Sequence, residues 1–230
     1  MVLPLYLAMT RAETAAAARL PPHWCYMACH FSPEGPGLCD LPDHLPPGTM
    51  VILNDRFPCR NHDPKRVAAE LGRLGRGGVL LDFERTPWED AIAVANTLFE
   101  TLPCPVAAPP GFIDDRSSPV FLPPCPLHVP LAEYLEPWRG REIWLEAALQ
   151  RQSVTVTARG TEYGPVLPGL IRAGGFFDEI LLCRRVTEIS DSEVRFTLFD
   201  TPDTLLLKLE EAAPLGVRRA VGLWKELENL

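Results

Sequence analysis

Two acidic residues, Asp82 and Glu84, stand at the end of an apolar run that begins at Gly78. Side chains alternate along a β-strand, so these two carboxylates share one face of the strand with Leu80. In a parallel β/α barrel, the functional side chains lie at the carboxyl ends of the strands. The spacing therefore predicts a buried strand over 78–84 that presents two carboxylates to one site.

Two carboxylates at this spacing could perform acid/base chemistry. Residues two apart on a strand lie about 6.6 Å apart along it. At a partly buried rim, two like charges at that range raise at least one pKa, which would keep Glu84 available as a proton donor near neutrality. In the alternative interpretation, Asp82 and Glu84 are solvated rim residues paired with Arg85 or Arg56.

Further candidates stand at the ends of other predicted strands. Asn54 and Asp55 end the third strand, where they either face the same site or bond their own backbone in a turn. Glu146 lies within the seventh strand, where an acid is costly unless it is paired or lines a site. We therefore predict that Asn54, Asp55 and Glu146 contribute to substrate binding.

Trp224 ends the last predicted strand and is a candidate surface for a sugar ring. Its neighbours of the same parity, Ala220 and Gly222, are small and would leave room for a ring inside a barrel. A tryptophan at this position could equally pack in the core.

The elements that position these residues alternate between strand and helix. Helices are predicted to begin at Asp63-Pro64, at Thr86-Pro87, where a capping box has Pro at the first helical position, and at Thr201-Pro202. The connections over 31–49 and 110–119 are rich in Pro and Gly and have no helical period. Eight segments are predicted as strands: Leu5–Thr10, His23–His30, Met50–Asp55, Gly78–Glu84, Pro105–Pro109, Val120–Pro123, Glu142–Ala148 and Arg219–Trp224.

This alternation predicts an α/β fold, a small (β/α)₈ TIM-like barrel in which some helices are missing. One region departs from the alternation. Ser153–Ala158 reads as a strand, and Glu179–Glu188 with Glu193–Phe199 reads as a hairpin that turns at Ser190. We expect a single barrel domain over residues 1–230 with an antiparallel β insertion near 150–200.

The run 78–84 resembles the fourth-strand signature D-G-x-D-x-D-x-E of glycoside hydrolase family 18. The C-terminal part is similar to the ending of the same family, with an aromatic strand and acidic turn over 194–204, a helix that carries Lys208, and a last strand over 216–224 that ends in Trp. The spore cortex-lytic glucosaminidase branch is the most similar. The family also has a small antiparallel insertion after its seventh strand.

The resemblance implies that Glu84 is the general acid/base. Asp82 would orient the substrate's acetamido group, which attacks the anomeric carbon in a substrate-assisted mechanism. The chain departs from the signature at two positions, because Gly77 stands where the first Asp would be and Leu80 where the second would be. Asp82 therefore loses the inner carboxylate that would share its proton.

A further departure concerns the sixth strand, where the family has a Tyr-Asp pair whose hydroxyl helps to hold the acetamido group. The corresponding run 120–126 contains neither residue. Tyr26 and Tyr163 are candidates to take the place of this tyrosine. The missing pair favours an altered substrate or a lost activity.

The composition limits the partners and the location. The 30 acidic and 22 basic residues give a net charge of −8, which argues against nucleic acid or an anionic membrane as partner. The seven cysteines contain no metal-binding spacing, so we expect reduced thiols, no metal and no cofactor. The N-terminal sequence lacks the basic region of a signal peptide, and we expect a cytoplasmic protein.

Three functions stay open on this evidence. The first is hydrolysis or binding of glycans or oligosaccharides that contain N-acetylglucosamine. The second is a non-catalytic carbohydrate-binding barrel that has lost the full acid motif. The third is an unrelated barrel hydrolase that uses Asp82, Glu84 and Glu146 on another substrate. The sequence makes no prediction of the oligomeric state.

Overall fold

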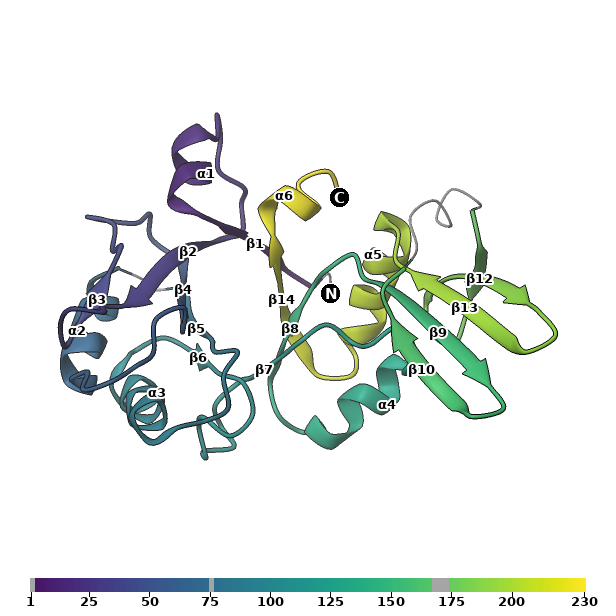
Figure 1. Ribbon diagram of the computed structural model, residues 1–230. Helices are drawn as coiled ribbons and strands as arrows, with labels where there is room; N and C mark the ends of the chain where they lie inside the picture. The colour runs from purple at the N-terminus through teal and green to yellow at the C-terminus, as the bar shows by residue number, and fades with distance from the viewer. Residues whose placement is uncertain (1–2, 75–76, 167–173) are drawn as a thin grey trace.

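The computed structural model describes residues 3–74, 77–166 and 174–230. Eight parallel strands follow one another around a barrel in chain order (Figure 1). A parallel bridge between Ala108 and Val120 closes the ring, and the Phe121 amide donates to the Ala108 carbonyl over 2.8 Å. All eight predicted strands are confirmed: β1 (Leu5–Met9), β2 (Trp24–Phe31), β4 (Met50–Asn54), β5 (Gly78–Asp82), β6 (Val106–Ala107), β7 (Val120–Leu122), β8 (Ile143–Glu146) and β14 (Val217–Leu223).

The barrel interior is filled by side chains and is not an open pore. At its amino end the guanidinium of Arg219 lies 4.4 Å from the centre of the Trp144 ring and donates to the Gly77 carbonyl over 2.8 Å. These contacts satisfy a charge that would be costly to bury alone. Apolar side chains fill the space above them: Ala8, Cys25, Met50, Ile52, Leu80, Ala107, Phe121 and Val221.

Helices cover only parts of the barrel. The helices α2 (Pro64–Leu74) and α3 (Glu89–Thr101) pack against the side formed by β2, β4, β5 and β6, and α5 (Pro202–Ala212) packs against β8 and β14. The shorter elements are α1 (Arg11–Ala16), β3 (Leu38–Cys39), α4 (Leu131–Leu135), the 3₁₀ turn η1 (Glu136–Trp138) and α6 (Trp224–Leu227). The segments 31–49 and 110–119 contain no helix, as predicted.

The predicted helix starts have different outcomes. Helix α5 begins at Pro202, and Thr201 forms its capping box with Thr204. Helix α3, however, begins at Glu89, so the capping box predicted at Thr86 is wrong. Trp88 has extended backbone and its indole N–H donates to the Cys59 carbonyl over 2.9 Å, which keeps this residue outside the helix.

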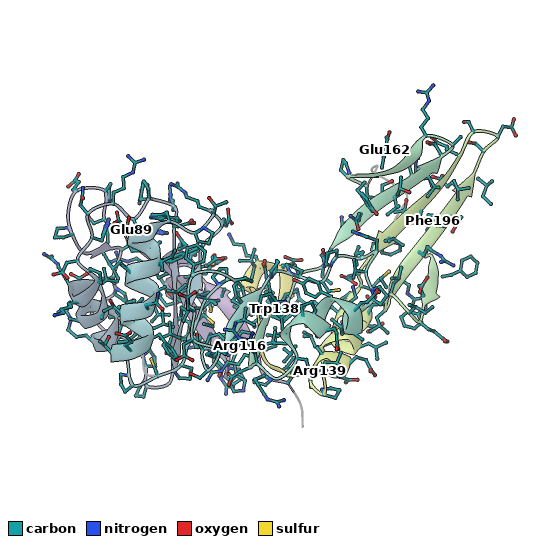
Figure 2. All side chains as sticks on the ribbon, turned by 90° about the horizontal axis from the view of Figure 1, so that it is seen from below. Glu89, Arg116, Trp138, Arg139, Glu162 and Phe196 are labelled. Carbon is teal, nitrogen blue, oxygen red and sulfur yellow. The ribbon has the colours of Figure 1, made fainter. Side chains whose placement is uncertain are left out.

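The predicted insertion is a separate antiparallel sheet of five strands, in the order β10-β9-β13-β12-β11. It projects from the barrel on the side away from α2 and α3, and Figure 2 shows Glu162 and Phe196 on this sheet, far from Glu89. The predicted hairpin turn lies between β12 and β13. The strands are β9 (Arg151–Thr157), β10 (Gly160–Gly164), β11 (Phe176–Asp178), β12 (Cys183–Ile189) and β13 (Glu193–Phe199).

Two general properties of the chain bear on its function. Among the described residues, no helix combines the length and apolar character that a membrane span requires. Cys25 and Cys29 are fully buried free thiols, and burial raises the pKa of Cys29 to about 12. Both thiols therefore contribute to packing as small apolar groups.

Candidate active site

The two acids of the predicted site line one cavity at the carboxyl ends of the strands, here called the mouth of the barrel. This mouth cavity has a volume of about 620 Å³. Asp82 ends β5 and is half-buried, whereas Glu84 follows it and is exposed. Asn54 and Asp55 line the same cavity, so four of the six predicted site residues lie together.

Asp55 holds the chain that carries Glu84. Its buried carboxylate accepts a hydrogen bond from the Glu84 amide over 3.2 Å and another from the Arg85 amide over 3.0 Å. The Arg85 side chain lies 3.9 Å from the same carboxylate. Asp55 therefore fixes the backbone just after β5, which gives Glu84 a defined position at the mouth.

Asn54 is held by His30, which was not among the predicted site residues. Its side-chain oxygen lies 2.6 Å from Nδ1 of His30 and also accepts from the Arg56 amide over 3.1 Å. His30 is buried at the end of β2 and lines the mouth cavity. Its position at a strand end was the only signal in the sequence. Asn54 therefore stabilises the turn after β4 and also lines the mouth cavity, so both predicted roles apply.

Glu146 approaches Asp82 from the other side of the barrel. Both residues line a smaller cavity of about 40 Å³, here called the inner cavity, directly above Leu80 and Phe121. Burial, followed by the charges of Glu84 and Asp55, raises the pKa of Asp82 to about 6. Burial, followed by the charges of Asp82, Glu226 and Glu84, raises the pKa of Glu146 to about 7. The raised pKa that we predicted for at least one of the two carboxylates on β5 therefore belongs to Asp82.

The packing of β5 explains the two acids that are missing from the signature. A Cβ on Gly77 would lie 2.0 Å from the Gly48 carbonyl oxygen, so no side chain fits at that position. Leu80 is 1% exposed and belongs to the apolar filling of the barrel. A side chain at position 77 would require the Gly48 backbone to move, and an acid at position 80 would replace part of the apolar filling below Asp82.

Trp224 makes the packing contacts of the second of its two predicted roles. It begins α6, is half-buried and packs against the hydrophobic cluster outside the barrel. The prediction that Ala220 faces the interior is wrong, because Ala220 packs with Leu205 of α5 and Val221 faces the interior instead. Gly222 and Leu223 line the inner cavity.

The two tyrosines considered as replacements for the sixth-strand tyrosine make other contacts. The Tyr26 hydroxyl donates to the Asp40 carbonyl over 3.0 Å. The Tyr163 ring lies 4.5 Å from the His128 ring, between the projecting sheet and the loop after β7. Within the described part of the chain, the Asp82 carboxylate has neither a hydrogen-bond donor nor an ion-pair partner.

The resemblance at the C-terminus has a structural counterpart. Lys208 on α5 donates to Asp200 over 2.7 Å, and both side chains are buried. Asp200 also accepts from the Gln150 amide and from the Thr204 hydroxyl, over 3.3 Å each. This pair fastens the projecting sheet and α5 to the barrel. Over the residues that the structure describes, no group of three or more His, Cys, Asp or Glu is arranged to hold a metal ion.

Comparisons with known proteins give structural matches only. No protein-family model matches the sequence, and neither does any curated protein. The spore cortex-lytic enzyme SleL of Bacillus cereus is matched over 96% of this chain and 70% of that one, with a TM-score of 0.54 and 10% identity. A GH18 chitinase from Cycas revoluta in complex with (GlcNAc)₃ is matched over 95% of this chain and 94% of that one, with a TM-score of 0.54 and 12% identity.

The chain has the fold of glycoside hydrolase family 18. A chitinase from Chromobacterium violaceum is similar as well, with a TM-score of 0.50, 10% identity and 98% coverage of both chains. The resemblance predicted from the β5 signature and the C-terminal residues is thereby confirmed for the fold. At such low identity the likeness concerns the backbone, and the chemistry must be argued from the residues of this chain.

Proposed function

We propose that this family 18-like barrel binds glycans that contain N-acetylglucosamine at its mouth and hydrolyses them. Glu84 is the general acid/base in this proposal, and Asp82 orients the substrate. The observation that carries the proposal is that both carboxylates line one mouth cavity, with the backbone of Glu84 fixed by Asp55. The likeness to a chitinase that was crystallised with (GlcNAc)₃ supports the substrate class.

The proposed reaction proceeds in two displacements. The acetamido oxygen of the substrate forms a bond to the anomeric carbon while the glycosidic bond breaks, and Glu84 gives its proton to the leaving oxygen. Ionised Asp82 accepts the acetamido N–H and stabilises the positive charge that develops on this group. Water then attacks the anomeric carbon, and Glu84 takes back a proton. The anomeric configuration is retained because it is inverted twice.

The remaining predicted site residues support this chemistry from the sides of the mouth. Asn54, held by His30, offers an amide to sugar hydroxyl groups, and Asp55 acts through Glu84. Glu146 lies deeper, beside Asp82. Stacking of a sugar ring on Trp224 stays a prediction.

A specific observation favours a second candidate, a barrel that binds glycans without cleaving them. The inner cavity is only about 40 Å³, because Leu80 and Phe121 fill the space below Asp82. The Tyr26 hydroxyl donates to Asp40 and the Tyr163 ring packs against His128, so neither tyrosine helps Asp82 to hold an acetamido group.

The experiment is release of a chromogenic aglycone from N-acetylglucosaminide and chito-oligosaccharide substrates, with Glu84→Gln compared to the wild type. The amide keeps the shape and removes the proton donor, so we expect a loss of ~10² or more. Glu89→Gln, an exposed acid at the start of α3, is the matched control and should keep full activity. Absence of turnover with retained oligosaccharide binding by calorimetry would favour the second candidate, and absence of both would contradict the proposal.

A further inference from the structure

Asp82 and Glu146 face a shared space that contains no other polar side chain. The inner cavity is otherwise lined by apolar groups and glycine: Ala8, Met27, Ile52, Leu80, Phe121, Val221, Gly222 and Leu223. The two acids stand at the carboxyl ends of β5 and β8, which are separated by β6 and β7 in the barrel. Neither carboxylate forms a hydrogen bond or an ion pair within the described residues.

The charges that raise the pKa values of this pair are acidic: Glu84 and Asp55 act on Asp82, and Glu226 on α6 acts on Glu146. Cations line the neighbouring cavities, with Arg11 and Arg56 at the mouth cavity and Lys208 in a small cavity that Glu146 also lines. Within the described residues none of them forms an ion pair with Asp82 or Glu146, and Lys208 is paired with Asp200. With no cation paired to them, two carboxylates in one apolar space cannot both be ionised without a large cost.

The pair can lower this cost by holding one proton between its two members. Burial and the charges of Glu84 and Asp55 raise the pKa of Asp82 to about 6, whereas burial and the charge of Asp82 raise the pKa of Glu146 to about 7, so Glu146 keeps its proton to the higher pH. The inner cavity, at about 40 Å³, is large enough for one water molecule to link the two groups.

We propose that Glu146 is the proton partner of Asp82 and replaces, from β8, the inner acid that β5 lacks at Leu80. This proposal rests on the proposed function, in which Asp82 must be ionised when the acetamido group binds. Glu146 takes the proton from Asp82 at that moment and returns it when the product leaves, so the number of protons is unchanged. Glu146 is thus a positioning residue that acts through Asp82.

The direct test follows the carboxyl carbons of Asp and Glu by ¹³C NMR from pH 4 to pH 9, with the Glu146 signal assigned from Glu146→Gln. In Asp82→Asn, we expect Glu146 to bind its proton about tenfold more weakly, because the neighbouring charge of Asp82 that raises the pKa of Glu146 has been removed. Asp82→Glu should retain most of the wild-type titration of Glu146. Glu142→Gln is the control, because its carboxylate lies at the other end of the barrel and only accepts from Trp144. An unchanged Glu146 titration in Asp82→Asn would overturn the proposal.

The second readout is the pH dependence of kcat on a chromogenic substrate. Glu146→Gln should displace one limb of the profile by about one pH unit and leave KM within about twofold. A loss of kcat at every pH with an unmoved profile would indicate a packing role and would count against the proposal. If the wild type has no turnover, the proposed function fails, whereas the NMR titration still decides whether the two acids share a proton.

Discussion

Replacement of Asp82 by Asn should raise the unfolding free energy, relative to that of the wild type, more at pH 8 than at pH 4. The pKa of Asp82 is raised from 3.8 to about 6, because the carboxylate is half-buried beside Glu84 and Asp55. An acid whose pKa is raised by folding contributes most stability when it is protonated, below pH 3.8. This contribution is lost as the pH rises through about 6.

The magnitude follows from linkage. A tenfold change in proton affinity corresponds to about 1.4 kcal/mol, so the rise in pKa of Asp82 costs about 3 kcal/mol once the pH is above 7. Asparagine carries no charge at any pH. The difference in unfolding free energy between Asp82→Asn and wild type should therefore grow by about 2.5 kcal/mol between pH 4 and pH 8, whatever the amide itself costs in packing.

The assay is urea unfolding followed by tryptophan fluorescence at one-unit steps from pH 4 to pH 8. With a slope of roughly 2 kcal/mol per molar urea, the midpoint difference between variant and wild type should change by about 1.2 M over this range. Asp191→Asn, at the exposed turn of the β12–β13 hairpin, is the control and should show no such change. A difference that does not vary with pH, or one that favours the wild type increasingly above pH 6, would refute the reasoning.

Three further substitutions test the packing that supports the site, each by urea unfolding at pH 7. Lys208→Met should lower the unfolding free energy by about 3–5 kcal/mol because it leaves the buried Asp200 without its cation, and Asp200→Asn in the same chain should recover much of the loss. Gly77→Ala should lower it by about 1–3 kcal/mol or more, since the added Cβ would meet the Gly48 carbonyl; no measurable change would contradict the close contact. Thr201→Ala should cost about 0.5–2 kcal/mol through loss of the α5 capping box, and Thr201→Ser should retain most of that stability.

The eight barrel strands could be predicted because each is a short apolar run bounded by Pro, Gly or polar residues. The start of α3 could not be predicted in the same way. Thr86-Pro87 has the local pattern of a helix cap, but the Trp88 ring packs against Phe83 and Phe112. These ring contacts, one of them to a residue 24 positions further along the chain, hold the backbone extended for two more residues.

The same limit applies to the site. Asp82 and Glu84 are two positions apart in one extended segment, so the sequence alone predicted that their side chains share a face. The pair formed by Asp82 and Glu146 depends on closure of the barrel and lies outside any local pattern. On β14 each face carries one arginine beside small or apolar residues, so hydrophobicity did not distinguish Ala220, which faces α5, from Val221, which faces the interior.

The most direct test of the proposed chemistry is the configuration of the first product, followed by ¹H NMR during cleavage of a chito-oligosaccharide. Substrate assistance at Asp82 with Glu84 as acid predicts that the β-anomer appears first and the α-anomer only by later mutarotation. The α-anomer appearing first would contradict this mechanism and point to an inverting pair of carboxylates instead. A chain that releases no product at all would contradict the hydrolytic function itself.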